Sequence, residues 1–168
     1  MHHIVITVLL FSAAILGLAL WISARTAGKK LTSLANVAEG FFAGHKTYLS
    51  TAAIGSRYLL AKPGADAAHA DVAVAADIPF GVFTDEAVGA EEPVNVNLLG
   101  THHSTQLMVA SGVIALGAFV VADAAGKIRT LPATTGTYYI IGRALTASAA
   151  LNDLVVVDPC SPIQRVVP

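Results

Sequence analysis

Residues 137–159, TYYIIGRALTASAALNDLVVVDP, contain two runs of apolar, β-branched and aromatic residues on either side of a Gly-Arg corner and a small-residue connection. The runs, residues 138–141 and 154–157, have the composition of two strands of one sheet. A similar stretch, IPFGVFTDEAVGAEEPVNVNLL, occupies residues 78–99, and aligning Gly81 with Gly142 superimposes the runs of both stretches. Because self-similarity at a fixed spacing exposes the building unit of a fold, the sequence predicts two copies of one small β unit.

The segments that lead into these stretches match as well, with residues 53–60 over residues 113–120. Between Val94 and Leu98, valine and leucine alternate with asparagine, which places the apolar side chains on one face of a strand. Further strands are expected at 46–49, 56–62, 72–74, 78–84, 105–110, 118–122 and 127–131, with a tight turn at 123–126. Strands this short and this closely spaced predict an all-β fold, a compact small barrel or sandwich.

Two segments are less regular. The Ala/Asp/His tract at 64–77 is interpreted as a loop with a short strand, with helix as the competing interpretation because alanine favours helices. The residues after Asp158 include Pro159, Pro162 and Pro168, and we expect this tail to be extended and peripheral.

The N-terminal segment has a different character. Residues 4–24 form 21 consecutive uncharged residues, followed by Arg25, Lys29 and Lys30. Their length, apolarity and basic flank are typical of a membrane-spanning helix, and the flank would keep the body in the cytoplasm. We therefore expect one N-terminal apolar helix with a basic connector over residues 1–33, an N-terminal arm at 34–55 and a β-rich domain at 56–168.

Composition excludes several classes of protein. A chain of 168 residues has room for one domain with a core of ordinary size. From residue 34 onward it carries seven Lys or Arg against eleven Asp or Glu, a balance of about −4 that argues against binding to nucleic acid. Only 12% of residues are charged and 55% are hydrophobic, which suggests that part of the surface is an interface. The single Cys160 excludes an internal disulfide framework.

No catalytic or metal-binding motif is present. The sequence has no G-x-S-x-G, H-E-x-x-H or C-x-x-C pattern. His102 and His103 are the strongest metal candidates, with His69, Asp66 and Asp71 as further ligands, but adjacent residues on a strand point to opposite faces. The acidic group Asp85, Glu86, Glu91 and Glu92 lacks the ligand spacing of a calcium loop and is interpreted as a solvated connection. We expect no enzyme activity, no metal and no cofactor.

An ordered series of segments resembles the small phage capsid cement or decoration proteins, a family long known as a prophage domain of unknown function. The segments that carry the resemblance are ANVAEG (35–40), RYLL (57–60), DIPFGVFTDEA (77–87), PVNVNLLG (93–100), AGKIRTLPATTGTYYIIGRALTA (125–147) and VVVDPCSP (155–162). Together they extend over nearly all of the chain from residue 34.

The resemblance implies a virion protein, made in the host cytoplasm, that binds the outside of the capsid lattice. Its partners would be the major capsid protein and copies of itself in a homotrimer, and its action would stabilise the head without catalysis. Aromatic and arginine residues are enriched at interfaces, which makes six residues candidates for oligomer or capsid contacts: Phe41, Phe42, Tyr48, Arg57, Tyr138 and Arg143. Arg143 has the alternative of a rim position within its own β unit.

The first 33 residues depart from the family pattern, which begins near Ala35. One hypothesis is that residues 1–33 are a translated upstream stretch that the mature protein lacks. The other is a membrane-anchored small β domain that serves as an assembly or scaffold subunit on the cytoplasmic face.

Overall fold

The strands of the described residues form two consecutive groups of five. The computed structural model describes residues 44–168, and their strands and one short 3₁₀ turn are β1 (His45–Ser50), β2 (Leu60–Pro63), β3 (His69–Val72), β4 (Gly81–Phe83), β5 (Pro93–Leu98), β6 (Gln106–Val109), β7 (Phe119–Ala122), η1 (Ala124–Gly126), β8 (Ile128–Thr130), β9 (Gly136–Ala144) and β10 (Leu154–Val167). The prediction of an all-β fold is confirmed. The expected N-terminal apolar helix and residues 34–43 of the expected arm lie outside the described residues. Within 44–168, no helix is long and apolar enough to cross a membrane.

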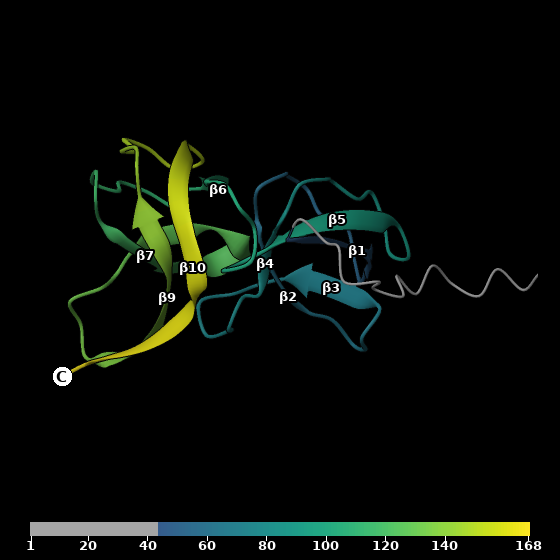
Figure 1. Cartoon of the computed structure of the whole chain (residues 1–168), viewed down its shortest axis with the longest axis horizontal. Helices are drawn as coiled ribbons and strands as arrows, with labels where there is room; N and C mark the ends of the chain where they lie inside the picture. Colours follow the sequence, from purple (N-terminus) through teal and green to yellow (C-terminus); the bar gives the residue numbers. More distant parts are fainter. Residues whose placement is uncertain (1–43) are drawn as a thin grey trace, which may run out of the picture. The chain divides into compact units, whose positions relative to one another are not determined.

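The two groups of strands have the same order. Strands β1 to β5 form a closed barrel in the order β1-β3-β2-β4-β5, and β6 to β10 form a sheet in the order β6-β10-β9-β7-β8 (Figure 1). In the barrel, β1 also pairs with β5, so opening the barrel between β1 and β3 gives the order β1-β5-β4-β2-β3. Adding five to each strand number gives β6-β10-β9-β7-β8, which is the order of the second sheet. We call strands β1–β5 the first unit and strands β6–β10 the second unit.

Strand register confirms that the units are copies of one design. Gly81 pairs with Leu98 in the first unit, and Gly142 pairs with Pro159 at the same place in the second. The outer pairs correspond in the same way, with Leu49↔Pro93 in the first unit and Val109↔Leu154 in the second. The sequence alignment through Gly81 and Gly142 was therefore correct for β4, β5, β9 and β10.

The units differ in how they close. In the first unit, β1 and β3 form a parallel ladder with the pairs Leu49↔His69 and Ser50↔Ala70. In the second unit, only one parallel bridge, Ala110↔Ile128, joins the corresponding edges. The first unit is consequently a complete small barrel, whereas the second is a sheet curled almost to closure.

Strand β2 begins four residues later than the sequence predicted. Residues 56–59 form a turn in which Tyr58 has a positive φ of 65°, so the strand begins only at Leu60. Leu60 pairs with Val82, and the equivalent pair in the second unit is Phe119↔Arg143. The predicted alignment, which placed Leu60 over Val120, was therefore wrong by one residue at this strand because the loop before β7 is one residue shorter.

Other boundaries also differ from the prediction. The tract at 64–77 contains β3 at His69–Val72 and no helix, which confirms the loop-and-strand interpretation with a shifted strand. The corner expected at Gly142 and Arg143 is the interior of β9, which continues to Ala144. The C-terminal tail is extended and largely exposed, as predicted, but it also pairs with β9, which the sequence did not predict. Strand β10 pairs with β9 as far as Val167, and an irregularity between Pro159 and Ile163 accommodates its prolines. Figure 1 shows the two strands running side by side.

The two units share their hydrophobic core. One cluster of buried side chains combines Leu60 and Val82 of the first unit with Met108, Ile141 and other residues of the second. A second cluster, which includes Phe83, Val94 and Val96, fills the barrel. Val94 and Val96 are fully buried, as their alternation with asparagine predicted. Burial of each such side chain contributes about 1.5–3 kcal/mol relative to exposure.

Candidate interaction surface

Two connections of the first unit lie side by side and line an open cavity. They are residues 51–59 and 84–91, which we call the first loop pair. Ile54 N donates to Ala87 O at 2.8 Å and Ala87 N donates back to Ile54 O at 3.2 Å, so a small antiparallel bridge joins them. Tyr58 N donates to Phe83 O at 2.7 Å and anchors the first connection on the end of β4. The loops are thus fixed by backbone bonds.

An open cavity of about 820 Å³ lies where the first loop pair meets the second unit. Its lining from the first unit is Ala53, Gly55, Ser56, Arg57, Tyr58, Leu59, Val72 and Glu86, and its lining from the second unit is Val109, Ala125, Lys127, Asn152 and Leu154. The lining contains two cations and one carboxylate but no histidine or cysteine.

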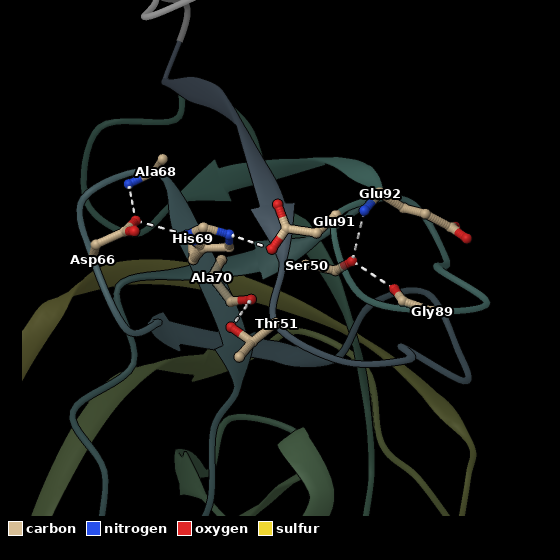
Figure 2. A network of polar contacts seen from close by, with 9 residues as sticks. All are labelled: Ser50, Thr51, Asp66, Ala68, His69, Ala70, Gly89, Glu91 and Glu92. Carbon is tan, nitrogen blue, oxygen red and sulfur yellow. Dashed lines mark hydrogen bonds and ion pairs between the residues drawn. The ribbon is translucent and has the colours of Figure 1, made fainter. Parts of the chain in front are cut away.

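A histidine bridged by two carboxylates stands at the beginning of β3 (Figure 2). His69 Nδ1 is 2.7 Å from Asp66 Oδ1, and His69 Nε2 is 3.0 Å from Glu91 Oε1. The hydrogen bond to Asp66, and next the one to Glu91, raise the pKa of His69 above its ordinary value. The hydrogen bond from His69 lowers the pKa of Asp66 in turn. The arrangement therefore favours an imidazolium held between two carboxylates.

The loop that supplies Glu91 is fixed by a buried serine. Ser50 Oγ donates to Gly89 O at 2.7 Å and accepts from Glu92 N at 3.2 Å, as Figure 2 shows. Glu91 itself has a positive φ of 62°, and its N donates to Ser50 O at 2.9 Å. These bonds hold the 89–92 turn against the end of β1 and present the Glu91 carboxylate to His69.

The structure does not gather the candidate contact residues into one site. Tyr48, on β1, is half-buried, and its ring meets the Phe80 ring edge to face with the two ring centroids 5.2 Å apart. Lys46 Nζ lies 4.5 Å from the centroid of the Tyr48 ring. Arg57 is exposed and lines the cavity beside the first loop pair. Phe41 and Phe42 lie outside the described residues.

Tyr138 and Arg143 both lie on β9 but make different contacts. Tyr138 is half-buried, and its hydroxyl is 2.9 Å from Thr134 Oγ1 while the Arg129 guanidinium lies 6.0 Å from its ring centroid. Arg143 is exposed, and its Nε donates to Gly117 O at 2.9 Å, a contact within its own unit. Their roles in an oligomer or on a capsid stay predictions.

The metal candidates do not form a common site. Among residues 44–168, no group of three or more His, Cys, Asp or Glu could hold a metal ion. His102 Nδ1 is 3.1 Å from Ser104 Oγ, while His69 is engaged with Asp66 and Glu91. In the acidic connection, Asp85 Oδ2 accepts from Asn95 N at 3.0 Å and Glu92 Oε2 accepts from Val88 N at 3.0 Å. Asp85 therefore caps a backbone amide of β5, and Glu92 caps one of its own loop.

The matching strand order and register of the two units define the class of fold, a duplicated all-β protein. The sequence model of the phage cement protein family matches residues 52–159. The chain belongs to this family, which confirms the resemblance seen in the sequence.

One solved structure repeats the fold. It is the head fiber gp8.5 N base of bacteriophage phi29, which matches with a TM-score of 0.52 and 18% sequence identity over 72% of this chain and 98% of that chain. At this identity the likeness supports the fold alone. A search of curated proteins found no match.

Proposed function

We propose that this protein is a capsid cement protein, which binds the outer lattice of a phage head and stabilises the shell. The observation that carries the proposal is the family match over residues 52–159. A cement protein that bridges neighbouring shell subunits adds its own contacts to the shell. The shell can open only when these contacts break, so their binding free energy opposes opening. A ligand that binds only the closed shell stabilises it by mass action.

The unit that binds is proposed to be a homotrimer. Closed point-group symmetry is the usual arrangement of oligomers, and a cyclic trimer requires each copy to offer two different, complementary surfaces. The sequence supports an oligomer because hydrophobic residues outnumber charged ones by 55% to 12%. Several large apolar side chains of the described residues are also exposed, which is typical of a surface that another protein covers.

The proposed action is binding alone, with neither catalysis nor a cofactor. The charged groups that the fold brings together serve local structure: Asp85 and Glu92 cap backbone amides, and His69 closes a bridge between two loops. The major capsid protein would be the principal partner, and the virion exterior the final location.

Addition of the full chain to capsids assembled without it tests the proposal. We expect saturable co-sedimentation with the capsids and a higher temperature of capsid opening, measured by light scattering. Light scattering coupled to size exclusion should show a trimer, either free in solution or after release from capsids. Full occupancy without any gain in capsid stability would contradict a cement function, and a monomer in both states would contradict the trimer.

A membrane-anchored assembly subunit is the second candidate, carried by the uncharged residues 4–24. Intact mass of the protein from its native source separates the two candidates. A species that begins near residue 34 eliminates the membrane anchor, whereas a full-length species that sediments with membranes favours it.

A further inference from the structure

The second unit repeats the loop arrangement of the first. Residues 111–118 and 145–152, which we call the second loop pair, lie side by side through Ile114 N to Ser148 O at 3.2 Å and Ser148 N to Ile114 O at 2.9 Å. Gly117 N donates to Ala144 O at 2.8 Å, which matches the bond from Tyr58 N to Phe83 O. The two loop pairs are therefore the same structural element in two copies.

The two loop pairs differ sharply in chemistry. The first contains Arg57, Asp85, Glu86 and Glu91, whereas the second contains no charged residue. Four large apolar side chains of the second loop pair are exposed: Val113 at 75%, Leu116 at 71%, Leu145 at 44% and Leu151 at 57%. In the first loop pair only one large apolar side chain, Val88, is comparably exposed.

Register shows that the fold does not require these apolar residues. Leu116 precedes Gly117 as Arg57 precedes Tyr58, and the strand pairing places Ala147 at the position of Glu86. At these positions the first unit carries an arginine and a glutamate where the second unit carries leucine and alanine, although its first connection is one residue longer. Exposed apolar side chains that folding does not require indicate a surface that a partner covers.

The first loop pair already shows how such a surface is used. It packs against the second unit, where Val109 N donates to Tyr58 O at 3.3 Å and Lys127 and Asn152 line the shared cavity. Within one chain, the first loop pair packs on the unit that follows it. If two copies associated head to tail in the same way, the second loop pair of one copy would pack on the first unit of the next copy.

The counterparts of Lys127 and Asn152 in the first unit make that continuation unfavourable. Matching strand pairs place His69 at the position of Lys127 and Glu91 at that of Asn152, and both belong to the bridge with Asp66. Covering these charged groups with uncharged loops would remove water without supplying hydrogen bonds. A partner surface that covers the second loop pair must itself be uncharged and largely apolar. The face of the first unit that carries His69 and Glu91 does not meet this condition.

We propose that the second loop pair is the face that docks on the capsid, and that it covers an uncharged, apolar surface of the shell protein. This inference rests on the proposed cement function. Leu116 and Leu151 are the side chains we expect to contribute most to the contact, because they are the two most exposed leucines of the second loop pair and leucine buries a large apolar area.

The test transfers the charges of the first loop pair to the second. The full chain carrying Leu116→Arg with Ala147→Glu should fold as the wild type does, because the first unit holds the same residue types at the same backbone positions. The matched control, Val88→Glu, removes the exposed apolar side chain of the first loop pair. Binding of each protein to capsids assembled without cement protein is measured by co-sedimentation, and thermal unfolding verifies the fold.

We expect the double variant to bind capsids at least about tenfold more weakly and Val88→Glu to bind as the wild type does. Leu151→Ser, which adds no charge, should weaken binding in the same direction. Unchanged capsid binding by a folded double variant overturns this inference alone. Loss of self-association with unchanged capsid binding also overturns it, because the occupant would then be a second copy. Failure of the wild type to bind any capsid refutes the proposed function as well.

Discussion

Tyr58 and Gly117 hold the same left-handed backbone conformation at equivalent positions of the two units, with φ of 65° and 79°. For a residue with a side chain this conformation costs about 1–2 kcal/mol. The Tyr58 side chain packs against both hydrophobic clusters, and each cluster contains residues of both units. Packing at the junction therefore offsets strain in the first unit, whereas the exposed loop of the second unit uses glycine.

Gly117→Ala should lower the free energy of unfolding by about 1 kcal/mol, because alanine must adopt the left-handed conformation. Its Cβ would lie 3.3 Å from the terminal nitrogen of Arg143, which is flexible and can move aside, so backbone strain is the main cost. Urea unfolding at neutral pH measures the change. At Gly112 an added Cβ meets no atom within 4 Å, so Gly112→Ala is the control and should change stability much less. Equal effects of both substitutions would contradict this account.

Gly142→Ala should be more damaging, at about 1–3 kcal/mol, because the site has no room for a methyl group. A Cβ at Gly142 would stand 2.5 Å from Asp158 O and 2.6 Å from Val157 Cγ1, on the strand paired with β9. Relief requires movement of the β10 backbone itself. Thermal unfolding should show a lower melting temperature than for Gly55→Ala, where no atom lies within 4 Å of the added carbon. A variant as stable as the wild type would show that β9 and β10 can separate without cost.

The repeat was visible in the sequence because it rests on local signals. Gly81 and Gly142 mark the same close approach of two strands, and the valine-rich runs that follow them have strand composition. The one-residue error at Leu60 arose because consecutive apolar residues give no register, and because a tyrosine with positive φ has no sequence signature. The path of β10 was missed because proline normally interrupts pairing, and here an irregularity between Pro159 and Ile163 accommodates it.

The interaction surfaces were harder to predict, since they depend on residues far apart in the chain. His69 and Glu91 are 22 positions apart, and only the closing of the barrel brings their side chains together. The second loop pair could be seen in the sequence as a charge-free copy of a charged one. That contrast gains meaning only when register shows that Leu116 and Arg57 occupy equivalent positions.

The bridge at His69 should make stability depend on pH. The pKa of His69 is raised in the folded state. The contribution of His69 to the free energy of unfolding is therefore complete below its unfolded pKa of about 6.5, and it is lost as pH rises through the higher folded pKa. The pKa of Asp66 is lowered, so its contribution is lost only as pH falls through that low value. The stability difference between wild type and His69→Gln should therefore be largest between about pH 4 and 6.5 and shrink above that range.

Urea unfolding of both proteins across this pH range measures the difference, with His103→Gln at an exposed histidine as the control. Titration of His69 by nuclear magnetic resonance gives the pKa directly. A His69 pKa at or below about 6.5 would contradict the bridge as an ion pair.

Ser148→Ala should destabilise the second unit by about 1–2 kcal/mol, because it breaks a buried hydrogen-bond pair. Ser148 Oγ donates to Gly112 O at 2.6 Å and accepts from Ile114 N at 2.9 Å, joining the two segments of the second loop pair. The equivalent residue of the first unit is Ala87, which is buried and has no hydroxyl, so the bond pair belongs to the second loop pair alone. Ser56→Ala, which removes an exposed hydroxyl, is the control and should leave urea unfolding unchanged.

If the proposed capsid contact is correct, Ser148→Ala should also weaken capsid binding at temperatures well below its unfolding transition. Stability lost without any change in binding would show that the docking face does not need this rigidity.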